Sequence, residues 1–237
     1  MTADVTPLDR RRAAGAETRQ RIVAVAEVLF AANGYDAVGL RDIIREAGIN
    51  SAAVHYHFGT KEALFLHILR LRAEPIAAAR MERLDALRAR EPFELRDVID
   101  AFLRPALEQA EPADPPRANY AELRARLSGK HEDTVRQLLA EIFDQSSKAF
   151  LDAIRQCLPD LPEADLYYRF HFLLGTMVYT MANPGRIRDL SFGGTDPFDF
   201  DEVLSHLVPF IEAGFRAAPL SKPAKRPLRR PAKRGKP

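Results

Sequence analysis

Apolar residues near the start of the chain recur with the spacing of an α-helix. Between Ile22 and Phe30 they fall at i, i+3, i+4, i+7 and i+8, and an Asn-Gly pair ends the run. The same spacing covers residues 40–47, and Gly48 follows where a left-handed residue is needed to reverse the chain. The pattern therefore predicts two helices, the second of which ends in a glycine turn.

A third, short helix is predicted at residues 51–57. Asn50 is a favourable N-cap, and Val54 and Phe58 are four residues apart, so both can face the core. The opposite face carries alanines, a tyrosine and a histidine. Small side chains let a helix approach base edges in the major groove, and hydroxyl or imidazole groups can hydrogen-bond bases or phosphates. Residues 40–57 therefore have the pattern of a helix-turn-helix.

Two basic residues flank the predicted third helix. Arg41 can reach a guanine or a backbone oxygen, and Lys61 opens the next helix after a Thr60 cap, where amide dipoles and an ammonium together attract phosphate. His55 and His57 are two positions apart and diverge by about 200° on a helix, so they cannot bind one metal ion through a shared face. No metal site is expected here.

The rest of the chain keeps the helical pattern, interrupted at clusters of proline, glycine and serine. Pro105 predicts a kink, and Pro209 predicts a bend because helical spacing resumes on both sides of it. The further predicted helices cover residues 61–89, 93–110, 117–128, 131–157, 163–182 and 200–217. The fold class is therefore all-α, with about nine helices in total.

Composition narrows the class of protein. The single cysteine, Cys157, rules out an internal disulfide and a cysteine-pair metal motif, which suits a reducing cytoplasm. No run of about 18 apolar residues exists, and the start lacks an apolar signal core, so neither membrane spanning nor secretion is expected. A nucleophile motif, a phosphate-binding glycine loop and paired carboxylates are all missing from the sequence. We expect no catalytic residue, no cofactor and no enzyme activity.

Charge is unevenly distributed along the chain. Residues 10–72 carry ten basic and six acidic side chains, residues 73–220 carry seventeen and twenty-five, and residues 221–237 carry eight and none. Basic ends around an acidic middle favour contact with a polyanion at the ends. The last segment alternates basic pairs with prolines, which predicts a disordered tail that either adds phosphate affinity or only aids solubility.

Residues 17–71 resemble the DNA-binding domain of the TetR family of transcription regulators. The resemblance includes residues 30–35, residues 40–48 and above all the run from Val54 to Leu64. It implies that two groups of residues contact double-stranded DNA. Bases or adjacent sugars are contacted by Arg41, Ser51, Ala52, Ala53 and His55, and phosphates by Tyr56, His57 and Lys61. The chain departs from the family at Gly39, where a threonine usually caps the second helix and contacts phosphate.

The resemblance also implies an order of domains and a homodimer. A flexible basic arm (1–16) precedes the helix-turn-helix domain (17–64), a ligand-binding and dimerisation domain (65–218) and the basic tail (219–237). In this family the last two long helices pair with those of a second subunit, and the two-fold axis presents two reading helices to a palindromic operator. We expect the dimer surface to use apolar residues that can also serve the core: Leu166, Phe170, Leu173, Met177, Leu204, Leu207, Ile211 and Phe215.

The body resembles more narrowly the fatty-acid-responsive repressors of the pseudomonad sigma-regulator type. This resemblance covers residues 158–162, 169–175 and 203–216. It implies a repressor that a long-chain fatty acid or acyl-CoA releases from DNA. The alternative effector is a drug or another hydrophobic small molecule, with efflux or catabolic genes under control. The expected ligand-binding residues, which can equally be ordinary core, are Phe102, Leu107, Leu138, Ile142, Phe143, Phe150 and Phe172.

Overall fold

The computed structural model describes residues 7–90, 92–108, 119–120, 123, 132–182 and 184–219, and these residues are helical with short connections and no strand. The helices are α1 (Pro7–Asn33), α2 (Leu40–Ala47), α3 (Ser51–Phe58), α4 (Lys61–Arg88), α5 (Leu95–Glu108), α7 (Glu132–Cys157), α8 (Glu163–Ala182), α9 (Pro184–Leu190) and α10 (Phe200–Arg216). The all-α prediction is therefore confirmed.

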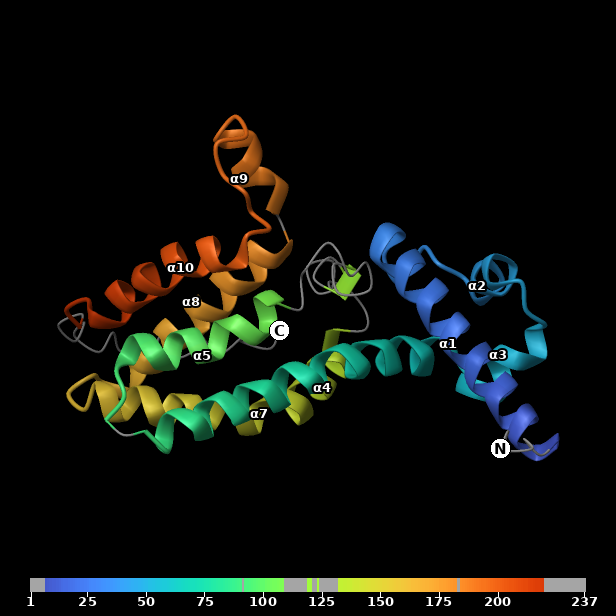
Figure 1. The fold of residues 1–237 in the computed structure, drawn as a ribbon, viewed down its shortest axis with the longest axis horizontal. Coiled ribbons are helices and arrows are strands. Elements are labelled where there is room, and N and C mark those ends of the chain that lie inside the picture. Colours follow the sequence, from blue (N-terminus) through green and yellow to red (C-terminus); the bar gives the residue numbers. More distant parts are fainter. Residues whose placement is uncertain are drawn as a thin grey trace, which may run out of the picture.

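The molecule is elongated, with two parts joined by one long helix (Figure 1). Helices α1, α2 and α3 form the head at one end, and α5, α7, α8 and α10 form the body at the other. Helix α4 runs from the head along the body, where it packs against α5 and α7, while α5 packs against α10. The segment that carries α9 projects from the body as an arm. None of the described helices combines the length and hydrophobicity needed to cross a bilayer.

Most helix boundaries agree with the sequence patterns, and the exceptions have local causes. Helix α1 begins at Pro7, so residues 7–16, predicted as part of a flexible arm, are helical. Proline favours the first turn of a helix, and the alanines that follow favour its continuation. The prediction also missed α9, which begins at Pro184 within a stretch predicted as a break. Helices α5 and α10 continue through their prolines, as does α4 through Pro75.

Two predicted segments lie largely outside the described residues. Of the helix predicted at 117–128, residues 119, 120 and 123 are described and are helical. The predicted basic tail lies outside the described residues except at Pro219.

Separate aromatic clusters mark the cores of the head and the body. In the head, the Phe65 ring of α4 meets Phe30 edge-on at 5.2 Å and Tyr35 at 4.7 Å between centroids. In the body, Phe102 of α5 contacts Phe150 of α7 and Phe170 of α8, with centroids 5.1 and 5.2 Å away. Helix α4 therefore contributes to the head core by its first turns and packs on the body by the rest of its length.

A buried ion pair fixes α4 to the head. The Glu27 side chain of α1 is 1% exposed, and its two carboxylate oxygens accept hydrogen bonds from Arg72 Nε and Nη2 at 2.8 and 2.7 Å. Arg70, two residues earlier and so on another face of α4, instead contacts Glu141 of α7 at 3.1 Å. One turn of α4 thus holds the head on one side and the body on the other.

We expect Arg72→Met to lower the free energy of unfolding by about 3–5 kcal/mol, because it leaves the Glu27 carboxylate buried without its ion-pair partner. Arg70→Met is the matched control, since its ion pairs are solvent-exposed, and it should cost less than about 1 kcal/mol. Urea unfolding at one protein concentration measures both. Equal losses in the two variants would contradict the importance of the Glu27–Arg72 pair.

Candidate functional site

The turn between α2 and α3 has the geometry that the glycine predicts. Gly48 adopts the left-handed conformation with φ 61° and ψ 38°, and its N–H donates to the Arg45 carbonyl at 3.3 Å. Asn50 Oδ1 accepts a hydrogen bond from the Ala52 N–H at 2.6 Å and so caps α3. Val54 is fully buried and anchors α3 to the head core. These local interactions fix which face of α3 points outward.

The outward face of α3 carries the residues that the sequence predicts for DNA contact. Ser51, Ala52, His55 and Tyr56 are exposed, and Tyr56 is 85% exposed, which is unusual for a large aromatic side chain. Ala53 and His57 are partly exposed. The His55 Nδ1 atom lies 3.0 Å from the Gly59 carbonyl oxygen at the end of the helix. The structure therefore presents this set of side chains together on one short helix.

The two predicted basic contacts lie on the elements that flank α3. Arg41 is exposed on α2. Lys61 begins α4, and its Nζ lies 4.1 Å from the centroid of the Tyr35 ring, a cation–π contact. The Thr60 hydroxyl accepts from the Ala63 N–H at 3.0 Å and caps α4. An ammonium at a helix N-terminus forms an electropositive site of the kind that binds phosphate.

Gly39, the departure from the family pattern, is still the N-cap of α2. It has no side chain to cap the helix, but its N–H donates to Asp42 Oδ2 at 3.0 Å, so half of a capping box remains. This backbone hydrogen bond, together with a 2.8 Å contact to Arg45, holds the pKa of Asp42 below its usual value. A Cβ at position 39 would lie 3.2 Å from Asp42 Oδ2, so a larger residue requires a small shift of that carboxylate.

The body contains a partly open cavity of about 280 Å³ between α4, α7 and α8. Of the seven predicted ligand residues, Phe143 lines this cavity. Phe102, Leu107, Leu138 and Phe150 are buried core residues that do not line it, and Ile142 packs against the core. Phe172 is 62% exposed, so its predicted place in the interior is wrong. The described residues that line the cavity are Ile76, Arg80, Ala106, Tyr120, Arg136, Leu139, Ala140, Phe143, Asp144, Ser147, Leu174, Met177, Val178 and Met181.

Sequence reasoning missed a buried arginine in the cavity wall. Arg80 of α4 is 2% exposed. Its Nε donates to the Phe102 carbonyl at 2.8 Å, Nη2 lies 3.2 Å from the Met177 sulfur, and the guanidinium lies 3.7 Å from the Phe102 ring centroid. The signal was present in the sequence, because Ile76, Arg80 and Leu84 occupy positions i, i+4 and i+8 of the buried stripe of α4.

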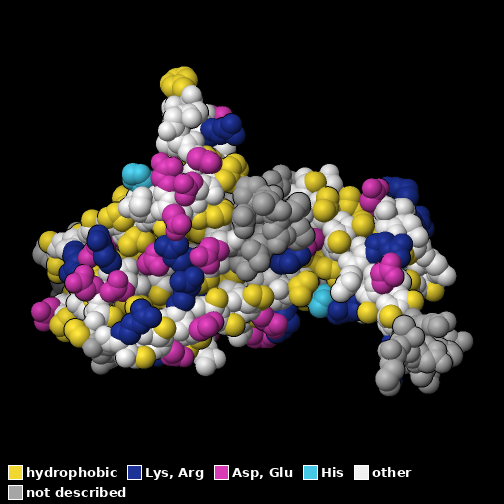
Figure 2. Space-filling view, in the orientation of Figure 1, with side chains coloured by type: hydrophobic (Ala, Val, Ile, Leu, Met, Phe, Trp, Pro, Cys, Tyr) yellow, Lys and Arg dark blue, Asp and Glu magenta, His cyan; other side chains and the backbone are white. Residues whose placement is uncertain are grey.

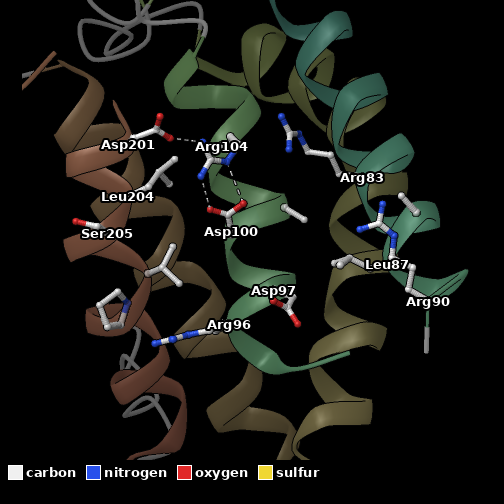
Figure 3. Close-up of a pocket in the computed structure, with 14 residues that line it drawn as sticks. Arg83, Leu87, Arg90, Arg96, Asp97, Asp100, Arg104, Asp201, Leu204 and Ser205 are labelled. Carbon is white, nitrogen blue, oxygen red and sulfur yellow. Dashed lines mark hydrogen bonds and ion pairs between the residues drawn. The ribbon is translucent and has the colours of Figure 1, made fainter. Parts of the chain in front are cut away.

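A larger cleft of about 680 Å³ lies at the surface between α4, α5 and α10, and its walls are charged. Figure 3 shows Arg104 of α5 between Asp100 of the same helix and Asp201 of α10, with nitrogen–oxygen distances of 2.9 and 2.7 Å. These carboxylates raise the pKa of Arg104. Figure 2 shows acidic and basic side chains interleaved over this region. An ion-pair network in the cleft therefore ties α5 to α10, and the walls of the cleft mix charged side chains with apolar ones such as Leu204 and Val208.

The eight residues predicted for the dimer surface are all buried within the single chain, so they are not exposed for contact with a second subunit. They are Leu166, Phe170, Leu173, Met177, Leu204, Leu207, Ile211 and Phe215. Both α8 and α10 are apolar on a second face as well, and the sequence does not show which face turns inward. The outer faces expose Tyr168, Phe172 and Tyr179 of α8 and Phe210 of α10. Figure 2 shows apolar side chains along this edge and at the tip of the arm.

Fold and site together define an all-helical protein with an amino-terminal helix-turn-helix head and a helical body that encloses a cavity. Residues 22–68 match the family described as bacterial regulatory proteins, tetR family, and residues 100–214 match the tetracyclin repressor-like C-terminal domain. The two matches together cover more than half of the chain. The chain belongs to the TetR family.

Individual relatives agree with this assignment. The HTH-type transcriptional regulator QacR of Staphylococcus aureus is 40% identical over 53 residues, which are 22% of this chain and 28% of QacR. The matches to curated relatives span between 28% and 51% of those proteins' lengths.

Two solved structures share the fold over nearly their whole length. NalD, the secondary repressor of the MexAB-OprM multidrug efflux pump in Pseudomonas aeruginosa, has a TM-score of 0.58 at 23% identity, covering 84% of this chain and 95% of NalD. The fatty acid degradation regulator FadR from Bacillus halodurans has a TM-score of 0.56 at 13% identity, with the same coverage. At these identities the similarity establishes the fold alone.

A histidine in the head has a shifted pKa with a consequence for stability. The Nε2 atom of His67 on α4 lies 3.1 Å from Arg19 Nη2 of α1, and its ring is 5.5 Å from that of Phe58. Burial and then the Arg19 charge lower the pKa of His67 below its usual value of 6.5. The unfolded chain therefore binds this proton more readily than the folded one, and stability falls as the pH drops below about 6.5.

We expect the wild-type melting temperature to fall between about pH 7.5 and about pH 5.5, because protonation of His67 favours the unfolded chain. His67→Gln should show a smaller fall, since it cannot take up this proton. Thermal unfolding followed by circular dichroism in matched buffers measures the difference. Parallel curves for the two proteins would show that His67 makes no contribution.

Proposed function

We propose that this protein is a homodimeric transcriptional repressor that binds a palindromic operator and is released by a small hydrophobic effector. The observation that carries the proposal is the exposed face of α3, which a left-handed glycine and an asparagine cap hold in a fixed orientation. Membership of the TetR family supports it. Bacterial operator DNA lies in the cytoplasm, where such a repressor acts.

In this proposal α3 lies in the major groove. Its small residues Ser51, Ala52 and Ala53 allow close approach, and His55 together with Arg41 of α2 contacts base edges or adjacent sugars. Tyr56, His57 and Lys61 contact phosphates and set the position of the helix on the duplex. The small side chains provide fewer base-specific hydrogen bonds than arginine or asparagine would, so phosphate contacts supply much of the affinity.

Lys61→Met tests the phosphate contacts. It should weaken binding by the same factor to a duplex selected from a random library and to an unrelated duplex, because phosphate contacts do not read sequence. The slope of log affinity against log salt should become shallower by about one. Fluorescence anisotropy titrations over a range of salt concentrations measure both quantities. Arg155→Met on α7 in the body is the control, and an unchanged slope in Lys61→Met would contradict the assigned role.

The outer faces of α8 and α10 support the homodimer. Their exposed aromatic side chains form a larger apolar surface than apolar residues that are scattered singly would form. Exposed apolar surfaces of this kind mark interaction sites. A two-fold axis through this surface would place α8 and α10 against the same helices of a second copy and present two heads on one side. The ion pairs of Arg104 join α10 to α5 and so connect this surface to the rest of the body.

Phe210→Asp should convert the dimer to a monomer, because Phe210 is 67% exposed at the centre of α10 and a carboxylate there would be buried against the second copy. Sedimentation velocity at a concentration where the wild type is dimeric measures the oligomeric state of the variant. Val28→Asp on α1 introduces the same charge at an exposed apolar residue of the head and should leave the dimer intact. A dimeric Phe210→Asp protein would place the interface elsewhere.

The cavity between α4, α7 and α8 is the effector site in this proposal. Its walls are mainly aliphatic and aromatic, which suits either a long-chain fatty acyl effector or a drug-like hydrophobic molecule. FadR and NalD, which share the fold, are described as regulators of fatty acid degradation and of multidrug efflux, respectively. A ligand that binds one arrangement of α4 more tightly than another would change the spacing of the two heads by a shift in population.

A further inference from the structure

We propose that the arm, residues 184–199, is a dimerisation element of its own: the arm of each chain packs on the body of the second copy and buries Phe192 there. The inference rests on the proposed function in one respect, because it takes the outer faces of α8 and α10 to be the dimer surface. It adds a separate contact to that surface and names the side chain on which the contact depends.

Helix α9 of the arm receives little support from its own chain. It has seven residues, and those at 185–190 are all exposed. It projects away from the body (Figure 1), and it packs on no other described helix as extensively as the paired helices of the body pack on one another. Isolated helices shorter than about 12 residues are marginal in water. Contact with another molecule would therefore stabilise α9.

The tip of the arm presents an aromatic ring to solvent in a defined position. Phe192 is 98% exposed and has a positive φ of 54°, which no other described non-glycine residue has. This conformation is costly for a bulky residue. The Gly193 N–H donates to the Arg188 carbonyl at 2.9 Å. Ser191 Oγ lies 2.9 Å from Thr195 Oγ1, so hydrogen bonds hold the tip. A strained backbone that keeps an apolar ring in water is typical of a contact site.

The apolar side of the arm continues the outer surface of the body. Ile187 and Leu190 are three residues apart, so they share one face of α9. They line a groove of about 520 Å³ whose other walls include Tyr179 of α8 and Phe210 of α10. In the proposed dimer the second copy covers the outer faces of α8 and α10. The molecule that covers Phe210 therefore also meets this groove, which favours the second copy over an unrelated protein as its occupant.

The exposed apolar area supports the same partner. On α8 and α10, the side chains of Tyr168, Phe172, Tyr179 and Phe210 are 60–67% exposed. At about 200 Å² for a fully covered aromatic side chain, they supply about 500 Å². An obligate homodimer buries at least about 1,000 Å² per partner, about two-thirds of it apolar. Phe192 adds about 200 Å², which brings the aromatic area to the apolar share of such an interface.

The symmetry of the dimer makes the contact reciprocal. Under a two-fold axis each chain presents one arm and receives another, so two Phe192 rings are buried per dimer. The arm then contributes to the affinity of the dimer, and dimerisation in turn stabilises α9. These two consequences can be measured separately.

Phe192→Asn tests the contribution of the arm to dimer affinity. Asparagine tolerates a positive φ better than phenylalanine does, so this variant keeps the shape of the tip and removes the ring. The dissociation constant of the dimer should rise at least about tenfold, because two rings lose their burial. Sedimentation velocity over a concentration series measures the constant. Val28→Asn removes an exposed apolar side chain from α1 of the head and is the matched control, which should leave the constant unchanged.

The outcomes separate this inference from the proposed function. An unchanged dissociation constant in Phe192→Asn would overturn the inference and leave the proposed homodimer intact. An equal rise in Val28→Asn would also overturn the inference, because the effect would not then be specific to the arm. A wild type that stays monomeric at every concentration would reject the proposed homodimer, and the inference with it.

Hydrogen exchange tests the arm without a substitution. The amides of residues 191–194 donate backbone hydrogen bonds at the tip. In the wild type they should exchange at least about tenfold faster below the dissociation constant of the dimer than above it, because so short a helix is not stable alone. Mass spectrometry of peptides that span the arm measures the rates. Equal rates at both concentrations would show that the arm is held by its own chain and would overturn the inference.

Discussion

The orientation of the head on α4 depends on a bidentate ion pair whose carboxylate is desolvated. Glu27 and Arg72 meet through two hydrogen bonds in a place that water does not reach on the carboxylate side. Hydrophobic contacts between α1 and α4 are non-directional and would tolerate sliding, whereas a bidentate guanidinium–carboxylate contact is satisfied in one geometry only. Helix α3, which carries the reading face, packs on α1, α2 and α4, so the position of that face depends in part on where this pair holds α4.

Helix α4 combines four roles on its different faces. Its first turn presents Lys61 beside α3, and the next turns contribute Phe65 to the aromatic core of the head. Arg70 and Arg72 then face the body and the head respectively, and beyond Pro75 the helix forms the wall of the cavity. Because α4 continues through Pro75 as one helix, a displacement at the cavity would reach the head without an intermediate element. The ion pairs of Arg104 stabilise the opposite side of the body, where α5 meets α10, and so provide a fixed frame for such a displacement.

The sequence predicted the head more completely than the body. Gly48 and Asn50 act through local backbone geometry, so single residues were enough to predict the turn and the start of α3. The buried position of Val54 on that helix then determined which face of α3 is exposed. In α8 and α10 apolar residues occur on two faces, and only packing decides which face turns inward; the predicted interface residues were therefore core, and Phe172 lies outside. Helix α9 is too short to show the periodic spacing of apolar residues that identifies a helix. The extension of α1 to Pro7 depends on the helix propensity of its residues and not on a periodic stripe of apolar residues. The burial of Arg80 does not follow from its residue type, because arginine usually lies at the surface, and only its place in the apolar stripe of α4 indicates it.

The Glu27–Arg72 pair also limits how this head can be joined to another body. Its two members lie on opposite sides of a boundary between head and body drawn at the end of the helix-turn-helix domain, before Arg72. A chimera that joins this head to a foreign body with an apolar residue in place of Arg72 would bury the Glu27 carboxylate without the charge of Arg72. The reverse chimera, which joins this body to a foreign head with an apolar residue in place of Glu27, would keep the Arg72 guanidinium without its carboxylate partner. Exchange of reading heads between regulators therefore requires a junction placed beyond Arg72, or the transfer of both residues as one unit.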